Sequence, residues 1–170
     1  VADYLSENGI AIVSSETLLL KSNSKINFII DILYSLENTN DEERRFELLY
    51  FLYEHLQIKT SKHAFFKKHV KATNDLIFKD LKAFGVSFNF LLFQQLPLYE
   101  KIEEIIRGFN LVTSSNAYVQ FFLDIVLEQQ RKAADIGDFL EFWERKKDAL
   151  SIVASENSDA VQVMTIHKSK

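Results

Sequence analysis

Apolar residues recur at helical spacing along most of the chain. Between Ser24 and Glu37, five of them fall three or four residues apart and share one face of a helix: Ile26, Ile29, Ile30, Leu33 and Leu36. Asn23 or Ser24 is placed to cap the first turn through its side-chain oxygen. The pattern therefore predicts a first long helix that begins near Ser24 and ends near Glu37.

The same spacing predicts a series of helices up to Leu150. The second is expected to begin after Asn40, with acidic residues in its first turn, where the positive end of the helix dipole favours them. Later helices are expected from Thr73 or Asn74 to Gly85, from Ser87 to before Pro97, from Leu98 to Gly108, from Ser114 or Ser115 to about Ala134, and from Gly137 to Leu150.

Strand patterns stand only at the two ends of the chain. Residues 10–13 are a short β-branched run, and from residue 160 to 166 β-branched residues alternate with other side chains. We therefore predict a mainly α fold with short terminal strands. The second run reaches Lys170 with no terminating Gly or Pro, and the chain begins at Val1, so we expect it to be a piece of a longer protein.

Composition agrees with one helical domain. The 170 residues include only 1 Pro and 4 Gly, and 47% are apolar. The 15 Phe residues are interpreted as core rather than as a platform for stacking bases. The absence of cysteine excludes disulfides and thiolate metal sites and fits a cytoplasmic protein. No apolar stretch is long enough for a membrane span, and no signal peptide is visible.

Charge argues against a nucleic-acid binder that is basic overall, since the net charge is −4. Residues 59–71, called the basic segment below, are the exception. They contain no acidic residue and five lysines: Lys59, Lys62, Lys67, Lys68 and Lys71. This segment is either a patch that contacts phosphates, with Lys67 and Lys68 as DNA-binding candidates, or a solvated helix face anchored by Phe65 and Phe66.

Signatures of a catalytic site are missing. No G-x-x-x-x-G-K-[ST] loop is present to hold nucleotide phosphates, and the four glycines are isolated near predicted helix ends. The histidines lack an H-E-x-x-H pattern, and no G-x-S-x-G elbow occurs. The carboxylate pair Glu103-Glu104 is interpreted as solvated charge on the polar face of a helix. The sequence therefore predicts no catalytic residue in this chain.

Three stretches resemble one family. Residues 163–170, Val-Met-Thr-Ile-His-Lys-Ser-Lys, resemble the start of motif V of UvrD/RecB-like superfamily 1 DNA helicases. Residues 7–20 resemble the segment where that family's second motor domain is interrupted by a helical insertion, with Ala11 in place of the usual proline. Residues 139–144, Phe-Leu-Glu-Phe-Trp-Glu, resemble the RecB/AddA-type branch most closely. Residues 50–135 match nothing in the family.

The resemblance implies a domain organisation. The expected parts are an edge of the second, RecA-like α/β motor domain at residues 1–15, a helical insertion of the 2B type at 16–158, and a return strand with the start of motif V at 159–170. It also implies roles for three residues. Thr165 and His167 match positions that contact single-stranded DNA, and Lys170 matches a position near the nucleotide phosphates.

The resemblance further implies a function for the longer protein. It would be an ATP-dependent 3′-to-5′ DNA helicase, alone or joined to a nuclease, that uses ATP and Mg²⁺ and acts in DNA repair or recombination in the cytoplasm. The present chain would bind neither cofactor. Its partners would be duplex DNA or a partner subunit of a helicase-nuclease, with no membrane involved. We expect the chain alone neither to hydrolyse ATP nor to unwind DNA.

A different class of function stays open. The acidic net charge and the Phe-rich core also fit a helical protein-interaction module with no nucleic-acid role. The motif V match argues against that reading. The residues that follow Lys170 would discriminate the two, because the helicase family continues with Gly-Leu-Glu-Phe.

Overall fold

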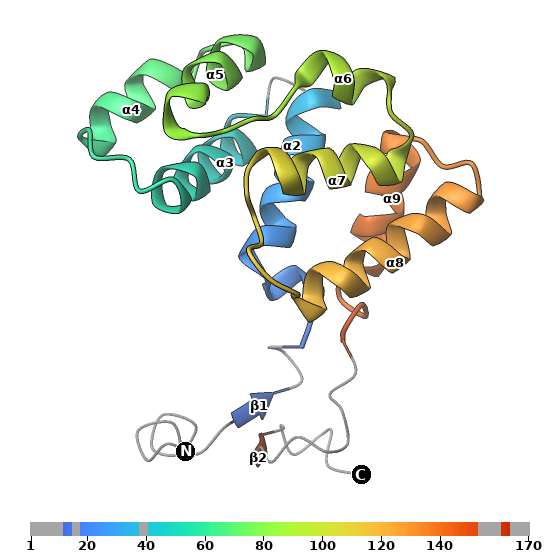
Figure 1. The fold of residues 1–170 in the computed structure, drawn as a ribbon. Helices are drawn as coiled ribbons and strands as arrows, with labels where there is room; N and C mark the ends of the chain where they lie inside the picture. The colour runs from blue at the N-terminus through green and yellow to red at the C-terminus, as the bar shows by residue number, and fades with distance from the viewer. Residues whose placement is uncertain (1–11, 15–17, 38–40, 153–160, 164–170) are drawn as a thin grey trace.

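The computed structural model describes residues 12–14, 18–37, 41–152 and 161–163, and it is mainly helical, as the sequence predicted (Figure 1). The elements in chain order are β1 (Ile12–Ser14), the 3-10 helix η1 (Leu20–Ser22), α2 (Ser24–Glu37), α3 (Glu42–His55), α4 (Lys62–His69), α5 (Asn74–Leu81), the 3-10 helix η2 (Lys82–Phe84), α6 (Phe90–Gln95), α7 (Leu98–Gly108), α8 (Ala117–Arg131), α9 (Ile136–Lys146) and β2 (Val161–Val163).

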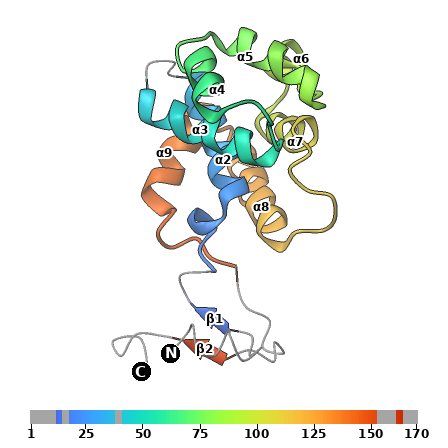
Figure 2. The ribbon, with the colours of Figure 1, turned by 90° about the vertical axis from the view of Figure 1, so that its left-hand side faces the viewer.

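Helix α2 is the centre of the helical body. It packs against α3, α7, α8 and α9, which surround it in both views (Figures 1 and 2). Its buried side chains extend around more of the helix than the one predicted stripe, because Phe28 and Ile32 are buried as well. Asn23 caps it, since its Oδ1 accepts the backbone N–H of Lys25 at 3.0 Å. The predicted bounds of this helix are confirmed.

Three helices begin at a different cap from the one predicted. The caps are Asp41 for α3, Asn89 for α6 and Asn116 for α8, in place of Asn40, Ser87, and Ser114 or Ser115. In each, the side-chain oxygen accepts the backbone N–H three residues further on. Asp, Asn and Ser are about equally good caps, so the spacing alone could not choose between neighbours. Asn40 itself lies outside the described residues.

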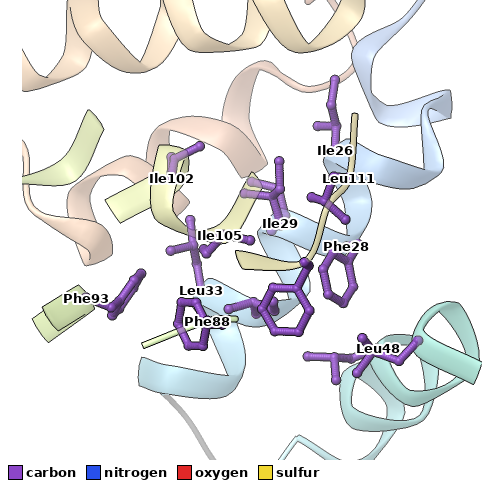
Figure 3. Close-up of a cluster of buried hydrophobic side chains, with 14 of the residues drawn as sticks. Ile26, Phe28, Ile29, Leu33, Leu48, Phe88, Phe93, Ile102, Ile105 and Leu111 are labelled. Carbon is purple, nitrogen blue, oxygen red and sulfur yellow. The ribbon is translucent and has the colours of Figure 1, made fainter. Parts of the chain in front are cut away.

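The phenylalanines form much of the core, as predicted. Eight of them are buried: Phe28, Phe65, Phe78, Phe88, Phe93, Phe109, Phe122 and Phe139. Phe88 lies in the loop before α6, not in a helix, yet it points into the body beside Leu33 and Ile105 (Figure 3). Its ring lies 4.9 Å from that of Phe78 and 5.2 Å from that of Phe109. This cluster joins α2, α5 and α7 to the loop before α6.

The prediction that Glu104 lies on a solvated helix face is wrong. Glu104 is only 5% exposed. Its Oε1 accepts the backbone N–H of Asn89 at 3.2 Å, and its Oε2 accepts from Arg107 Nη2 at 2.8 Å. A buried carboxylate is tolerated where it is hydrogen-bonded in this way. Glu104 therefore holds the loop before α6 against α7, which spacing along one helix could not reveal.

The two ends of the helical body lie side by side. Leu20 N donates to Leu150 O at 2.9 Å, and Ile152 N donates to Leu18 O at 3.0 Å. Lys21 and Asp148 form an ion pair at 2.5 Å next to this contact. We call these paired segments, residues 18–21 and 148–152, the neck. The chain thus leaves the helical body beside the place where it enters.

Beyond the neck, β1 and β2 form a parallel pair. Ile12 pairs with Val161, Val13 with Gln162 and Ser14 with Val163. Figures 1 and 2 place this pair at one end of the helical body. The expectation that the two strand regions lie together on one side of the body is confirmed. Parallel strands require a crossover connection, and here the whole body from α2 to α9 is that connection.

Candidate nucleic-acid interface

The three motif V residues lie outside the described residues. β2 ends at Val163, and Thr165, His167 and Lys170 follow in the part of the chain that is not described. Their roles in DNA and nucleotide binding stay predictions. Of the DNA-binding candidates, the structure describes Lys67 and Lys68, both in the basic segment.

Helix α4 carries most of the basic segment on a surface held by aromatic residues. Ser61 caps it, because its Oγ accepts the Ala64 N–H at 3.2 Å. Phe65 is 4% exposed, and the Phe66 ring lies 4.7 Å from that of Phe46 on α3. Anchoring by the two phenylalanines belongs to the solvated-face alternative for the basic segment. It fixes the orientation of α4, so that its lysines point away from the core.

Two of the five lysines are held by carboxylates. Lys62 Nζ lies 2.9 Å from Glu54 Oε1 and 4.0 Å from the centre of the Tyr50 ring, and the hydrogen bond to Glu54 raises the pKa of Lys62. Lys68 Nζ lies 2.6 Å from Asp80 Oδ2 on α5. These acids come from outside the basic segment. The surface around the segment is therefore less positive than the sequence of residues 59–71 alone indicates.

Asp80 binds a second residue of the segment. His69 is 4% exposed, with its Nε2 3.1 Å from Asp80 Oδ2 and its Nδ1 2.9 Å from the Phe65 carbonyl oxygen. The hydrogen bond from Lys68 is the main cause that lowers the pKa of the Asp80 carboxyl. Asp80 therefore joins α5 to the end of α4, and Lys68 acts in this contact rather than as a free surface cation.

The remaining lysines of the segment are Lys59, Lys67 and Lys71, called the free lysines below. All three are exposed, and no carboxylate among the described residues forms an ion pair with them. Lys67 lies in the last turn of α4, and Lys71 lies in the turn that follows this helix. An ammonium group without a partner is available to a phosphate oxygen. These three side chains, with Lys68 excluded, form the candidate DNA-contacting surface.

Sequence reasoning missed Arg45, which lies close to this surface. Arg45 is on α3 and is 5% exposed, and no carboxylate in the described ranges lies within ion-pair distance of its guanidinium. It lines an open pocket of about 620 Å³ together with Lys71, Thr73, Asn74 and Asp75. We call this the Arg45 pocket. The one feature of the sequence that could have indicated this residue is its position four residues before Leu49, on the face of α3 that is turned toward the core.

A second charged cluster lies near the neck. Arg44 is 3.4 Å from Asp31 and 3.1 Å from Glu144 on α9, and its guanidinium carbon lies 3.7 Å above the Tyr34 ring. Tyr34 donates its hydroxyl to Glu144 at 3.0 Å. Burial raises the pKa of Asp31 to about 6 and, as the largest cause, that of Tyr34 to about 12. The cluster ties α9 to α2 and α3 and has the features of a structural contact.

The described residues show neither a membrane-spanning helix nor a metal-binding group. None of the helices there is long and apolar enough to cross a membrane. No group of three or more His, Cys, Asp or Glu side chains there could hold a metal ion. The described residues also include no phosphate-binding loop of the nucleotide-hydrolase type.

Comparison with known proteins adds no family assignment. No family model, curated protein or solved structure matches the chain. The resemblance to helicases therefore rests on the three sequence stretches that carry it.

Proposed function

We propose that this chain is the helical insertion of a UvrD/RecB-like superfamily 1 DNA helicase, bordered by two strands of its second motor domain. The longer protein would be an ATP-dependent 3′-to-5′ helicase, alone or joined to a nuclease, that acts in DNA repair or recombination in the cytoplasm. ATP and Mg²⁺ would be bound by its motor domains. The helical body would contact duplex DNA and would have no ATPase activity of its own.

One observation carries this proposal: the chain enters and leaves the helical body at the neck. The bonds Leu20–Leu150 and Ile152–Leu18 bring the two ends together, and β1 and β2 then pair in parallel. This is the geometry required of a domain inserted between two neighbouring strands of a parallel sheet. A module that folds independently of a sheet has no need of paired ends. The motif V resemblance follows directly after β2, where a return into that sheet would place it.

The free lysines support the contact with DNA. They form a local cationic surface on a chain whose net charge is −4, and the proposed binding to phosphates depends on them. Such binding is independent of sequence and falls with salt, because it releases counterions from the DNA. An interface of this kind can hold the duplex without reading bases.

The test is binding of the chain to a short labelled duplex across a salt series. We expect weak binding whose logarithm falls linearly with the logarithm of salt concentration. The double variant Lys67→Glu, Lys71→Glu, which changes two of the free lysines, should abolish it. Unchanged binding by that variant would remove the basic segment from the proposal.

Independently, the coding sequence should continue past Lys170 with Gly-Leu-Glu-Phe and should encode a phosphate-binding loop before Val1. Any other continuation would remove the helicase assignment.

A contact with a protein partner is the second candidate function, and exposed leucines on α6 favour it. Leu91 is 72% exposed and Leu92 42% exposed, on a helix of only six residues. Neighbouring exposed leucines are typical of surfaces that bind another protein. If the helical body binds a partner subunit instead of DNA, Leu91→Asp should abolish that complex and leave duplex binding unchanged. Size-exclusion chromatography of the longer protein with its co-purifying subunits would measure this.

A further inference from the structure

Arg45 is buried without a counter-charge. It is 5% exposed, and its only hydrogen bond within the described residues joins Nη1 to the Ala72 carbonyl oxygen at 3.4 Å, beyond the usual range. A guanidinium has five N–H donors, and withdrawing it from water without an acid is costly. Burial accordingly lowers the pKa of Arg45. The remaining donors are left available toward the pocket that Arg45 lines.

The start of α5 lines the same pocket. Thr73 caps the helix by accepting the Leu76 N–H, whereas the N–H groups of Asn74 and Asp75 have no acceptor in the described part of the chain. These first-turn N–H groups stand at the positive end of the helix dipole. Arg45 and the first turn of α5 therefore present donors and positive charge to one volume.

The start of α5 is held rigidly in place. Asn74 Nδ2 donates to the Ser35 carbonyl oxygen at 2.9 Å, and the Ser35 hydroxyl donates to Asn74 Oδ1 at 3.1 Å. These two bonds fix the start of α5 to the end of the central helix α2. A site whose donors are already oriented loses little entropy when a ligand binds.

The pocket also contains two carboxylates, and they narrow the choice of ligand. Glu42 and Asp75 line it beside the cations Arg45 and Lys71. Formal charges therefore cancel, and a free anion would gain little from entering. A phosphodiester of a polymer differs, because a neighbouring phosphate can be held at the same time by Lys67 in the last turn of α4.

We propose that the Arg45 pocket receives one backbone phosphate of duplex DNA, held by the Arg45 guanidinium and the first N–H groups of α5. This inference rests on the proposed function and deepens it. The free lysines supply the surrounding attraction, and Arg45 supplies a directional, forked contact that a lysine cannot make.

The experiment measures binding of the chain to a short labelled duplex by fluorescence anisotropy across a salt series. Arg45→Gln should weaken binding about tenfold and lower the log–log salt slope by about one unit. Arg45→Lys should weaken it less and keep the slope. Asp75→Asn should tighten binding about threefold, because it removes a competing charge. Asp75 is exposed, so this variant tests the pocket even if changes at Arg45 impair folding.

The outcomes separate this inference from the proposed function. If Lys67→Ala weakens binding while the Arg45 and Asp75 variants bind like the wild type, the pocket assignment is overturned and the DNA-contact function survives. If the wild type binds no duplex, both fail. Titration with inorganic phosphate, followed through the amide NMR signals of Asn74 and Asp75, tests whether the pocket binds a free anion instead of DNA. Saturation of those signals by phosphate, with no duplex binding, would make the pocket a small-anion site and overturn the proposal.

Discussion

A Cβ atom at Gly108 would lie 2.6 Å from the Cα of Phe88. The last turn of α7 and the loop before α6 are therefore in backbone contact, and Ser87 N donates to Gly108 O at 2.8 Å in the same place. Since no side chain fits between them, glycine is needed here for close approach. This contact lets the Phe88 side chain enter the core from a loop.

Gly108→Ala should destabilise the fold by about 2 kcal/mol, because overpacking against backbone outweighs the gain in helix propensity. Gly137→Ala is the matched control, since its added Cβ would meet nothing closer than Asp135 Oδ1 at 3.4 Å. That variant should be neutral or stabilising by up to about 1 kcal/mol. Urea unfolding of both variants measures the difference. Equal stability of the two would contradict the close approach.

Glu104→Ala should cost about 1–3 kcal/mol of stability, because the Asn89 N–H then loses its acceptor in a buried place. The neighbouring change Glu103→Ala serves as the control, since Glu103 is only half-buried. It should change stability by less than about 0.5 kcal/mol. Chemical denaturation of the pair gives both values. A loss at Glu104→Ala as small as that at Glu103→Ala would restore the assignment of this pair to a solvated face.

Asp31 should make the fold less stable as pH rises from about 4 to 6. Its pKa is raised from 3.8 to about 6 by burial, so in this window the folded state keeps a proton that the unfolded chain releases. The loss amounts to about 3 kcal/mol and is complete above the folded pKa. Relative to the wild type, Asp31→Asn should therefore gain about that much between pH 4 and pH 7.

Asp148→Asn is the control of opposite sign. The hydrogen bond from Lys21 lowers the pKa of Asp148, so this carboxylate stabilises the fold above its ordinary pKa and less as pH falls. Relative to the wild type, that variant should be less stable by a nearly constant amount from pH 4 to 7, and the difference should shrink only as pH falls below the ordinary Asp pKa of 3.8. Thermal unfolding at a series of pH values records both trends. A pH-independent difference for Asp31→Asn would show that Asp31 does not titrate in this window.

The free lysines should matter more for DNA binding than the paired ones. Lys67→Ala and Lys71→Ala should each lower the log–log salt slope of duplex binding by about one unit. Lys62→Ala should leave the slope nearly unchanged, because Glu54 already neutralises Lys62. Anisotropy titrations of the single variants give the slopes. If all three alanine variants behave alike, the distinction drawn from the ion pairs has no effect on binding.

The sequence alone determined where most helices lie, because amphipathic periodicity and capping are local properties of a few turns. The stripe from Ile26 to Leu36 placed α2 correctly, and the β-branched runs placed the strand regions near β1 and β2. Caps were misplaced by one or two residues because Asn, Asp and Ser caps are close in energy. The resemblance to motif V also came from sequence, and the roles of Thr165, His167 and Lys170 stay predictions.

Only the tertiary structure decided which charges are free and which are buried. Lys68 looked like Lys67 in the sequence, but Asp80 on the next helix forms an ion pair with Lys68 and not with Lys67. Glu104 looked like a surface charge and Arg45 gave no clear signal, yet the packing of neighbouring elements removes both from solvent. Electrostatic partners are set by distances across the fold, and those distances are fixed when helices pack around α2. No periodicity along the chain carries that information.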